Sequence, residues 1–280
     1  MTQAPTPRRG DRPAGYLDIV SVTPHDPPPV IEPGQEAIRS AATVMLVRDA
    51  GSGVETFMLR RVTAMSFAAG MTVFPGGGVE PGDRGDIAWH GSDPEWWGTA
   101  LGVEPPTARA LVIAAVRELF EETGVLLAGR DPDGPPTVLP DDLRETVVAG
   151  RATMLQVLAD AGLGVRSDLL RPWANWLTPP GQGRRYDTFF FAAALPEGQQ
   201  ARMLTTEADL GEWRRPDELF AERAAGRTRL MPPTMVMLRD LARFGSVGRL
   251  LAEPRVVTKV RVRPEDVARL VAGDGLVVPS

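Results

Sequence analysis

The sequence contains no cysteine, one lysine and two histidines among its 280 residues. The absence of cysteine excludes disulfides, thiol catalysis and thiolate metal sites together. The two histidines, His25 and His90, are expected in surface or loop positions, and positive charge comes almost entirely from arginine.

Long apolar runs are also absent, since no segment approaches the roughly 20 residues that a membrane-spanning helix needs. The N-terminus is polar and rich in proline, without the apolar core of a signal peptide. A net charge of −5 argues against nucleic acid as a bulk partner. A hydrophobic content of 43% and a charged content of 24% are typical of a globular protein. We therefore expect a cytoplasmic protein whose partners include neither nucleic acid nor a membrane.

The order of the chain suggests one main domain with additions at both ends. Residues 1–37 are crowded with prolines and are expected to form a loose or surface-hugging arm. Residues 38–245 are expected to form the domain, with 246–280 as an extension packed on it. The apolar patterns predict strands at 41–48, 55–61, 169–177, 189–195, 255–263 and 275–278, the first two antiparallel. They predict helices at 141–149, 153–161, 216–224 and 234–244.

The segment 117–125, Arg-Glu-Leu-Phe-Glu-Glu-Thr-Gly-Val, ends a further predicted helix. Pro105 and Pro106 are expected to lie outside this helix, with Thr107 as its N-cap. Gly124 is expected to end it in a left-handed conformation. The helix is expected to be covered on more than one face, because apolar residues lie on both sides of its core stripe. That stripe is Ala108, Leu111, Val112, Ala115 and Leu119.

Three carboxylates gather at the C-terminal end of this helix. Glu118, Glu121 and Glu122 are three or four positions apart or adjacent, so they share one helical surface. Their mutual repulsion and the helix dipole both oppose negative charge there. A hard cation such as Mg²⁺ would reverse that cost, because it prefers oxygen ligands. The alternative is an ordinary solvated acidic helix end.

The same residues resemble the second half of the Nudix box, the signature of Nudix hydrolases. Its first half resembles residues 74–83, Phe-Pro-Gly-Gly-Gly-Val-Glu-Pro-Gly-Asp, in which Asp83 stands where the family usually has glutamate. Asp83 precedes Arg117 by 34 positions, so the box is interrupted by about 26 residues. The insertion, roughly 84–106, carries Trp89, Trp96 and Trp97, which either pack over the core or line a substrate entrance.

The resemblance implies an α/β protein with the Nudix fold, an α/β/α sandwich with a mixed β-sheet and an insertion inside the box. It implies that Glu118, Glu121 and Glu122 hold Mg²⁺ or Mn²⁺ and that Arg117 orients them. The general base is then Glu121, Glu122 or Glu207, an acid outside the box that matches an additional glutamate of the family. Substrate contacts are expected from Arg61, Gly76, Gly77, Arg184 and Arg185.

The implied reaction is hydrolysis of the diphosphate bond of a nucleoside diphosphate linked to another moiety. Arg61 and residues 70–77 match an extra motif of coenzyme A diphosphatases, although Ser66 replaces its second arginine. Coenzyme A or acyl-CoA, cleaved to 3′,5′-ADP and 4′-phosphopantetheine or its acyl form, is therefore the expected substrate. ADP-ribose, nucleotide-sugar or dinucleotide hydrolysis is the first alternative, and a non-catalytic Nudix-fold binding module is the second. For assembly, a homodimer is considered.

Overall fold

The computed structural model describes residues 20–22, 38–51, 53–63, 68–180 and 184–261. Within them, the runs predicted as strands form β2 (Arg39–Ala50), β3 (Gly53–Arg61) and β10 (Tyr186–Ala194). β2 pairs antiparallel with β3, as predicted, and parallel with β10. Phe189 and Phe191 of β10 are buried in one core, and Phe190 in another. A strand buried on both faces belongs in the middle of a sheet that is covered on each side.

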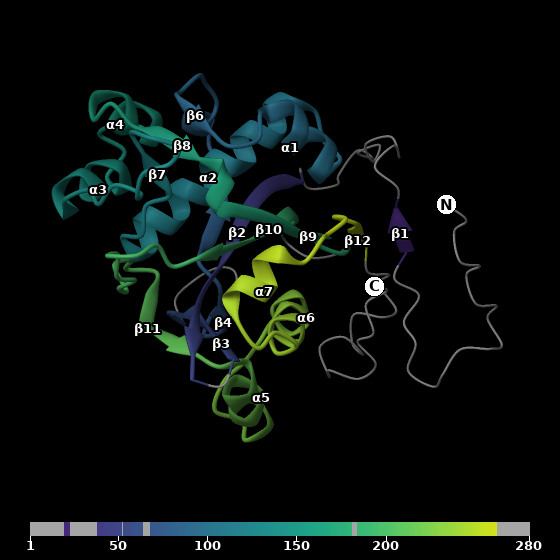
Figure 1. Ribbon diagram of the computed structural model, residues 1–280. Coiled ribbons are helices and arrows are strands. Elements are labelled where there is room, and N and C mark those ends of the chain that lie inside the picture. The colour runs from purple at the N-terminus through teal and green to yellow at the C-terminus, as the bar shows by residue number, and fades with distance from the viewer. Residues whose placement is uncertain (1–19, 23–37, 52, 64–67, 181–183, 262–280) are drawn as a thin grey trace.

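The remaining strands extend this sheet in both directions, and the predicted mixed sheet is confirmed (Figure 1). Its spatial order is β1 (Val20–Val22), β12 (Lys259–Arg261), β9 (Leu170–Leu177), β10, β2, β3 and β11 (Ala208–Arg214), with β4 (Thr72–Val73) beside β3 and β5 (Gly76–Gly78) beside β2. A second, small sheet consists of β6 (Trp89–His90), β8 (Gly164–Arg166) and β7 (Ala128–Gly129).

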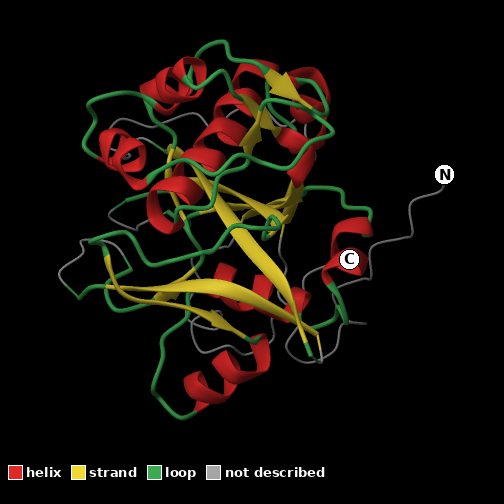
Figure 2. Cartoon of the chain, turned by 60° about the vertical axis from the view of Figure 1, so that its left-hand side comes forward, coloured by secondary structure: helices red, strands yellow, loops and turns green. Residues whose placement is uncertain are grey.

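Helices cover both faces of the main sheet, which confirms the α/β/α sandwich (Figure 2). One layer contains α1 (Pro94–Leu101), α2 (Pro105–Thr123), α3 (Asp141–Val148) and α4 (Met154–Asp160). The other contains α5 (Pro216–Ala224), α6 (Pro232–Leu241) and α7 (Val247–Ala252). In the described part of the chain, no helix combines the length and the apolar character needed to cross a bilayer.

The central helix α2 is buried nearly all round. The predicted core stripe has no exposed surface, and Ile113 and Phe120 on the other side are equally buried. Gly124 ends the helix with φ at 77°, as predicted. The start was predicted wrongly, because the N-cap is Glu104 and both prolines lie in the first turn. Proline is tolerated there since N–H groups of the first turn have no intrahelical partner.

The same error recurs at α6, which begins at Pro232 and not after the proline pair. At the other end of the sequence, β1 lies within the proline-rich arm and pairs with β12. This part of the arm is therefore attached to the sheet edge. The expected strand at 275–278, and the residues His25 and Ser66, lie outside the described residues, and the domain boundaries stay predictions.

The insertion forms β6 and α1 and packs on α2. Trp97 is 1% exposed and contacts Phe191 of the sheet with a ring-centroid distance of 5.9 Å. Trp89 lies beside the guanidinium of Arg109, and Trp96 is half exposed. The packing role is therefore the one that the structure supports for Trp97.

Candidate active site

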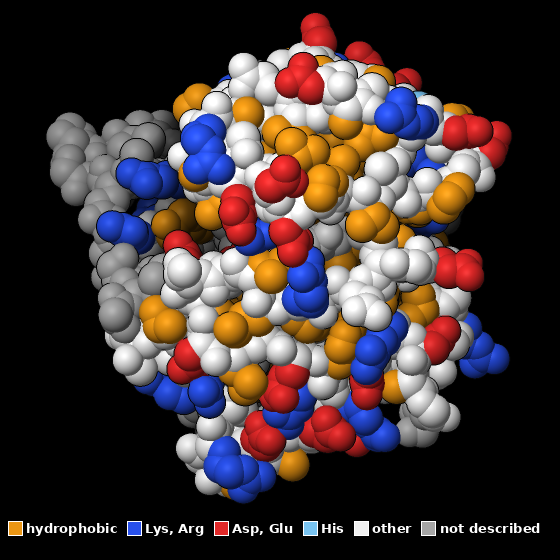
Figure 3. Space-filling view, turned by 90° about the vertical axis from the view of Figure 1, so that its left-hand side faces the viewer, with side chains coloured by type: hydrophobic (Ala, Val, Ile, Leu, Met, Phe, Trp, Pro, Cys, Tyr) orange, Lys and Arg blue, Asp and Glu red, His pale blue; other side chains and the backbone are white. Residues whose placement is uncertain are grey.

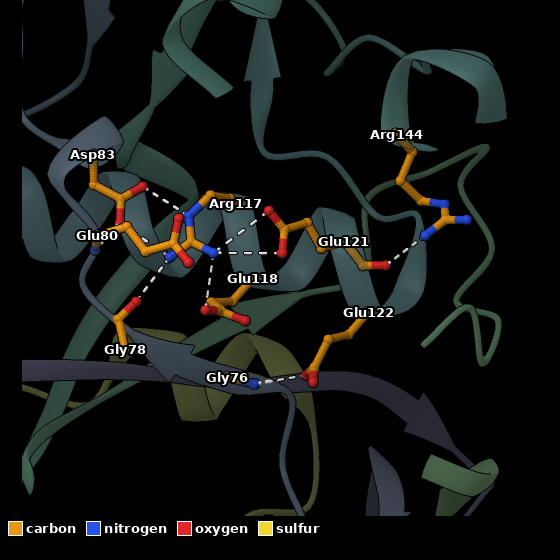
Figure 4. A network of polar contacts seen from close by, with 9 residues as sticks. All are labelled: Gly76, Gly78, Glu80, Asp83, Arg117, Glu118, Glu121, Glu122 and Arg144. Atoms are coloured by element: carbon orange, nitrogen blue, oxygen red, sulfur yellow. Dashed lines mark hydrogen bonds and ion pairs between the residues drawn. The ribbon is translucent and has the colours of Figure 1, made fainter. Parts of the chain in front are cut away.

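Arg117 is the centre of a buried charge network at the end of α2 (Figure 4). Its Nε and Nη2 donate to the two carboxylate oxygens of Asp83, at 2.8 and 3.0 Å. Nη2 also donates to the carbonyl oxygen of Gly78 at 2.8 Å. Asp83 has no exposed surface and Arg117 is 4% exposed. Two parallel hydrogen bonds fix the guanidinium plane, so the orientation of Arg117 is set by a residue 34 positions away in the sequence.

The remaining guanidinium nitrogen of Arg117, Nη1, faces carboxylates at the end of α2. Nη1 donates to Glu118 at 2.9 Å and lies 3.4 Å from both oxygens of Glu121. The orienting role predicted for Arg117 is consistent with this geometry. Asp83 fixes the arginine that faces these carboxylates, and its negative charge also raises the pKa of Glu118 and Glu121.

Gly77 makes room for the carboxylate of Glu118. A Cβ at Gly77 would lie 2.7 Å from Cδ and 2.9 Å from Oε2 of Glu118, closer than real Cβ contacts allow. β5, which contains this glycine, pairs with β2 directly beneath α2. Gly77 is therefore required for the close approach of strand and helix.

Gly76 forms the second contact between strand and helix. Its backbone N–H donates to Glu122 Oε2 at 2.8 Å. Its φ of 155° and the lack of space beside Ala42 and Thr43 exclude a side chain at this position. Glu122 is 8% exposed and has this backbone N–H as its hydrogen-bond donor (Figure 4).

Burial raises the pKa of all three glutamates. Desolvation raises the pKa of Glu118 to about 7, although the charge of Arg117 opposes the shift. Desolvation also raises the pKa of Glu121, again against Arg117. The pKa of Glu122 lies well above its ordinary value because of desolvation and the nearby charge of Glu118. Packing these acids together therefore favours their protonated forms, so one arginine does not balance the cluster.

The donor chemistry of the cluster fits a hard divalent cation. Three carboxylates within one helical turn offer oxygen ligands, and a cation would supply the positive charge that these groups lack. Within the described ranges, no three acidic or histidine side chains already converge as a complete set of metal ligands. Glu121 and Glu122 instead turn toward Arg117 and Gly76, so they would have to rotate toward a cation.

Glu207 lies close to this cluster through Arg61. Nη2 of Arg61 donates to Glu207 at 2.9 Å, and the backbone N–H of Val62 donates to the Glu207 carbonyl at 2.9 Å. The charges of both residues act on the pKa of Glu122, Arg61 lowering it and Glu207 raising it. The side chain of Glu207 is half exposed and that of Arg61 is largely buried. Two predicted site residues separated by almost 150 positions thus meet beside the box.

The predicted pair Arg184 and Arg185 is not joined to the box carboxylates by any contact in the described part of the chain. Nε of Arg185 donates to the carbonyl of Thr178, and Arg184 is exposed at the start of β10. Their contact with substrate stays a prediction.

Two residues of the site were missed by sequence reasoning. Glu80 lies near Glu121, and its charge raises the pKa of Glu121. Arg144 of α3 donates to the backbone carbonyl of Glu121 at 2.9 Å. Glu80 falls inside the glycine-rich half of the box, which was a usable signal. Arg144 lies on the same helical face as buried Val147, which indicated only that it points inward.

The face of the molecule that carries α3, α4 and β11 has mixed charge. Figure 3 shows acidic and basic side chains interspersed there, without a large patch of one sign.

Arg117 and the three carboxylates at the end of α2 lie in a part of the chain that matches a known protein family. Residues 98–243, just over half of the chain, match the family described as the NUDT19 Nudix domain. The chain belongs to the Nudix hydrolase family, in the branch of this domain.

Individual relatives support this assignment. Acyl-coenzyme A diphosphatase NUDT19 of Gallus gallus is 30% identical over 243 residues, covering 70% of this chain and 63% of that protein. The Homo sapiens protein of the same name is 27% identical, covering 79% of this chain and 72% of its own. The chain thus spans somewhat under two thirds of the chicken protein's length.

A solved structure shows the same fold. The crystal structure of a Nudix hydrolase from Alicyclobacillus acidocaldarius superposes with a TM-score of 0.66 at 27% sequence identity. The superposition covers 79% of this chain and 98% of that one. The predicted Nudix fold is confirmed.

Proposed function

We propose that this protein is a metal-dependent diphosphatase that cleaves coenzyme A or acyl-CoA to 3′,5′-ADP and 4′-phosphopantetheine or its acyl form. The observation that carries the proposal is the buried pair of Arg117 and Asp83, which holds an arginine against three helix-end carboxylates. A solvated acidic helix end would not need a buried, bidentate arginine beneath it.

The proposed roles follow from the contacts. Glu118, Glu121 and Glu122 would hold Mg²⁺ or Mn²⁺, and Arg117 orients the first two. When bound, such a cation neutralises charge on phosphoryl oxygens and lowers the pKa of a coordinated water. Glu121, Glu122 and Glu207 are the candidates for accepting the proton of the attacking water. Arg61, Gly76 and Gly77 lie close enough to these carboxylates to contact a diphosphate.

The substrate is proposed from two observations. The relatives from Gallus gallus and Homo sapiens are named acyl-coenzyme A diphosphatases. Residues 61 and 70–77 match the coenzyme A motif. The backbone N–H of Gly70 donates to the Arg61 carbonyl, so the two parts of the motif are in contact. Arg184 and Arg185 are proposed to contact the substrate further along the sheet. We also propose that the protein is cytoplasmic and forms a homodimer.

A substrate panel tests this function. Coenzyme A, an acyl-CoA, ADP-ribose, a nucleotide sugar and a dinucleotide polyphosphate would be incubated with Mg²⁺, with Mn²⁺ and with chelator, and the products identified by mass spectrometry. We expect 3′,5′-ADP from coenzyme A or acyl-CoA only when metal is present. Cleavage of ADP-ribose, a nucleotide sugar or the dinucleotide alone would replace the substrate assignment, and no cleavage at all would favour a binding module.

A further inference from the structure

The C-terminal end of α2 is bound by a distant segment of the chain. The last four carbonyls of a helix have no intrahelical partner and need donors from elsewhere. The carbonyl of Phe120 accepts from the capping Gly124 N–H at 2.8 Å. The carbonyls of Glu122 and Thr123 accept from the N–H groups of Leu204 and Arg202, each at 3.0 Å.

Arg144 completes this set. Its Nη1 donates to the fourth carbonyl, that of Glu121, at 2.9 Å, and also to the carbonyl of Leu204 at 3.3 Å. One guanidinium nitrogen therefore connects the helix end with the segment 202–204. Arg144 comes from α3, which is otherwise a short surface helix with exposed acids in its first turn.

Burying the charged side chain of Arg144 costs more free energy than a purely structural role would justify. Arg144 is 7% exposed and makes no salt bridge within the described residues, because Asp141, the carboxylate on which its charge acts, is exposed and paired with Arg202. The buried Nε of Arg144 has no hydrogen-bond partner in that part of the chain either. A buried charge without an ionic partner costs stability. Its position does supply positive charge at the negative end of the α2 dipole, directly behind the acidic cluster.

The segment held by Arg144 leads to Glu207. Glu207 lies three positions after Leu204, and both its backbone N–H and its backbone carbonyl are hydrogen-bonded. Its N–H donates to Thr205 Oγ1 at 3.1 Å and its carbonyl accepts from Val62 at 2.9 Å. Glu207 is thus held between two anchors: residues 202–204, docked on α2, precede it, and the end of β3 binds it through Arg61 and Val62.

We propose that Arg144 is a positioning residue for diphosphate hydrolysis, which holds the segment 202–207 on the end of α2 and so fixes Glu207 relative to Glu121 and Glu122. This inference rests on the proposed function for its kinetic consequence. Its structural consequence does not depend on any activity. Displacement of a catalytic group by about 1 Å can lower turnover as much as 100-fold.

The test compares Arg144→Met and Arg144→Lys with a matched control, Arg151→Met. Arg151 follows α3 and is exposed, and its guanidinium donates to Thr146 Oγ1 at 3.4 Å. In Arg144→Met we expect faster amide hydrogen exchange at Arg202, Leu204 and Glu207. We also expect a kcat about 10- to 100-fold lower, with KM changed less. Lysine retains a donor and the charge, so Arg144→Lys should recover part of both properties.

The outcomes separate the inference from the proposed function. Wild-type exchange and wild-type kcat in Arg144→Met would overturn the positioning role. An equal kcat loss in Arg151→Met, or a uniform rise in exchange throughout the protein, would also overturn it. If Arg144→Met does not fold, Arg144→Lys decides by the same two measurements. Absence of activity in the wild type would contradict the proposed function, while the exchange at residues 202–207 would still decide the role of Arg144.

Discussion

Two arginines in the described part of the chain, Arg117 and Arg214, each contact three carboxylates. Arg117 lies 2.8 Å from Asp83, 2.9 Å from Glu118 and 3.4 Å from Glu121. Arg214 of β11 lies 2.6 Å from Glu212, 2.6 Å from Glu222 and 3.5 Å from Glu218. The two clusters have the same composition but differ in burial. The acids around Arg117 are between 0% and 20% exposed, and those around Arg214 between 28% and 51%.

The pKa shift of Glu222 in the surface cluster has the opposite sign from those of the three glutamates at the end of α2. The hydrogen bond from Arg214 lowers the pKa of Glu222. Desolvation raises the pKa of Glu118 and Glu121 in spite of Arg117, and that of Glu122 in spite of its hydrogen bond from the Gly76 N–H. At the surface, the hydrogen bond from Arg214 stabilises the ionised form of Glu222. In the buried cluster one arginine does not balance the negative charge of the carboxylates, so a further cation would stabilise their ionised forms.

The largest expected contrast is in stability. Arg117→Met leaves Asp83 buried without its partner, and we expect the free energy of unfolding to fall by about 3–5 kcal/mol. Arg214→Met removes an exposed network, for which about 0–1 kcal/mol is expected. Urea denaturation of both variants in the presence of chelator measures the difference, and equal losses would contradict the distinction between the clusters.

The next contrast is in turnover. Glu121→Gln and Glu122→Gln keep the size of the side chains but remove the charge, and we expect each to lower kcat at least about 100-fold without unfolding the protein. Glu222→Gln is the matched change in the surface cluster and should leave kcat unaltered. Steady-state kinetics with Mn²⁺ and circular dichroism would check both. Retained activity in both box variants would remove these carboxylates from the site.

A smaller effect is expected from a methyl group in β5. In Gly77→Ala the new Cβ would displace the carboxylate of Glu118, and we expect kcat to fall roughly tenfold. Gly78→Ala is the control, because no atom lies within 4 Å of the position its Cβ would take. Since the displaced group is the end of a flexible side chain, the melting temperature should change little in either variant.

The smallest contrast concerns pH in the metal-free protein. Because the pKa of Glu122 is raised in the folded state, ionisation of Glu122 destabilises the fold as pH rises above about 4.3, the ordinary value for glutamate. Glu122→Gln should therefore increase the free energy of unfolding at pH 8 and have little effect near pH 4. Glu222→Gln should instead decrease the free energy of unfolding at pH 8. The pKa of Glu222 is lowered in the folded state, so the stability that its ionised form contributes is lost as pH falls. Denaturation curves at both pH values would show whether the signs differ.

Prediction from the sequence succeeded where the relevant contacts are local. The position of the three glutamates on one turn, the left-handed Gly124 and the antiparallel β2 and β3 all depend on residues close together in the chain. The helix start failed for a local reason too: prolines were treated as a boundary, although the first helical turn accepts them. The strong apolar pattern of β10 indicated a buried strand, and the structure adds that it is central and parallel to β2.

Residues whose role depends on distant partners could not be assigned in this way. Asp83 is separated from Arg117 by the insertion, so its bidentate contact was not deducible from spacing. Arg144 is one of 30 arginines, and no local pattern distinguishes it from those on the surface. Its role depends on hydrogen bonds to two carbonyl oxygens, which belong to residues 23 and 60 positions away.

The sequence alone determined that three glutamates share one turn of a helix capped by Gly124, because helical periodicity and glycine conformations are properties of a few neighbouring residues. Only the tertiary structure decided which charges are buried, and with them the sign of every pKa shift in the site. Burial is produced by the sheet, by the insertion and by the segment 202–207 packing around α2, and no short stretch of sequence contains that information.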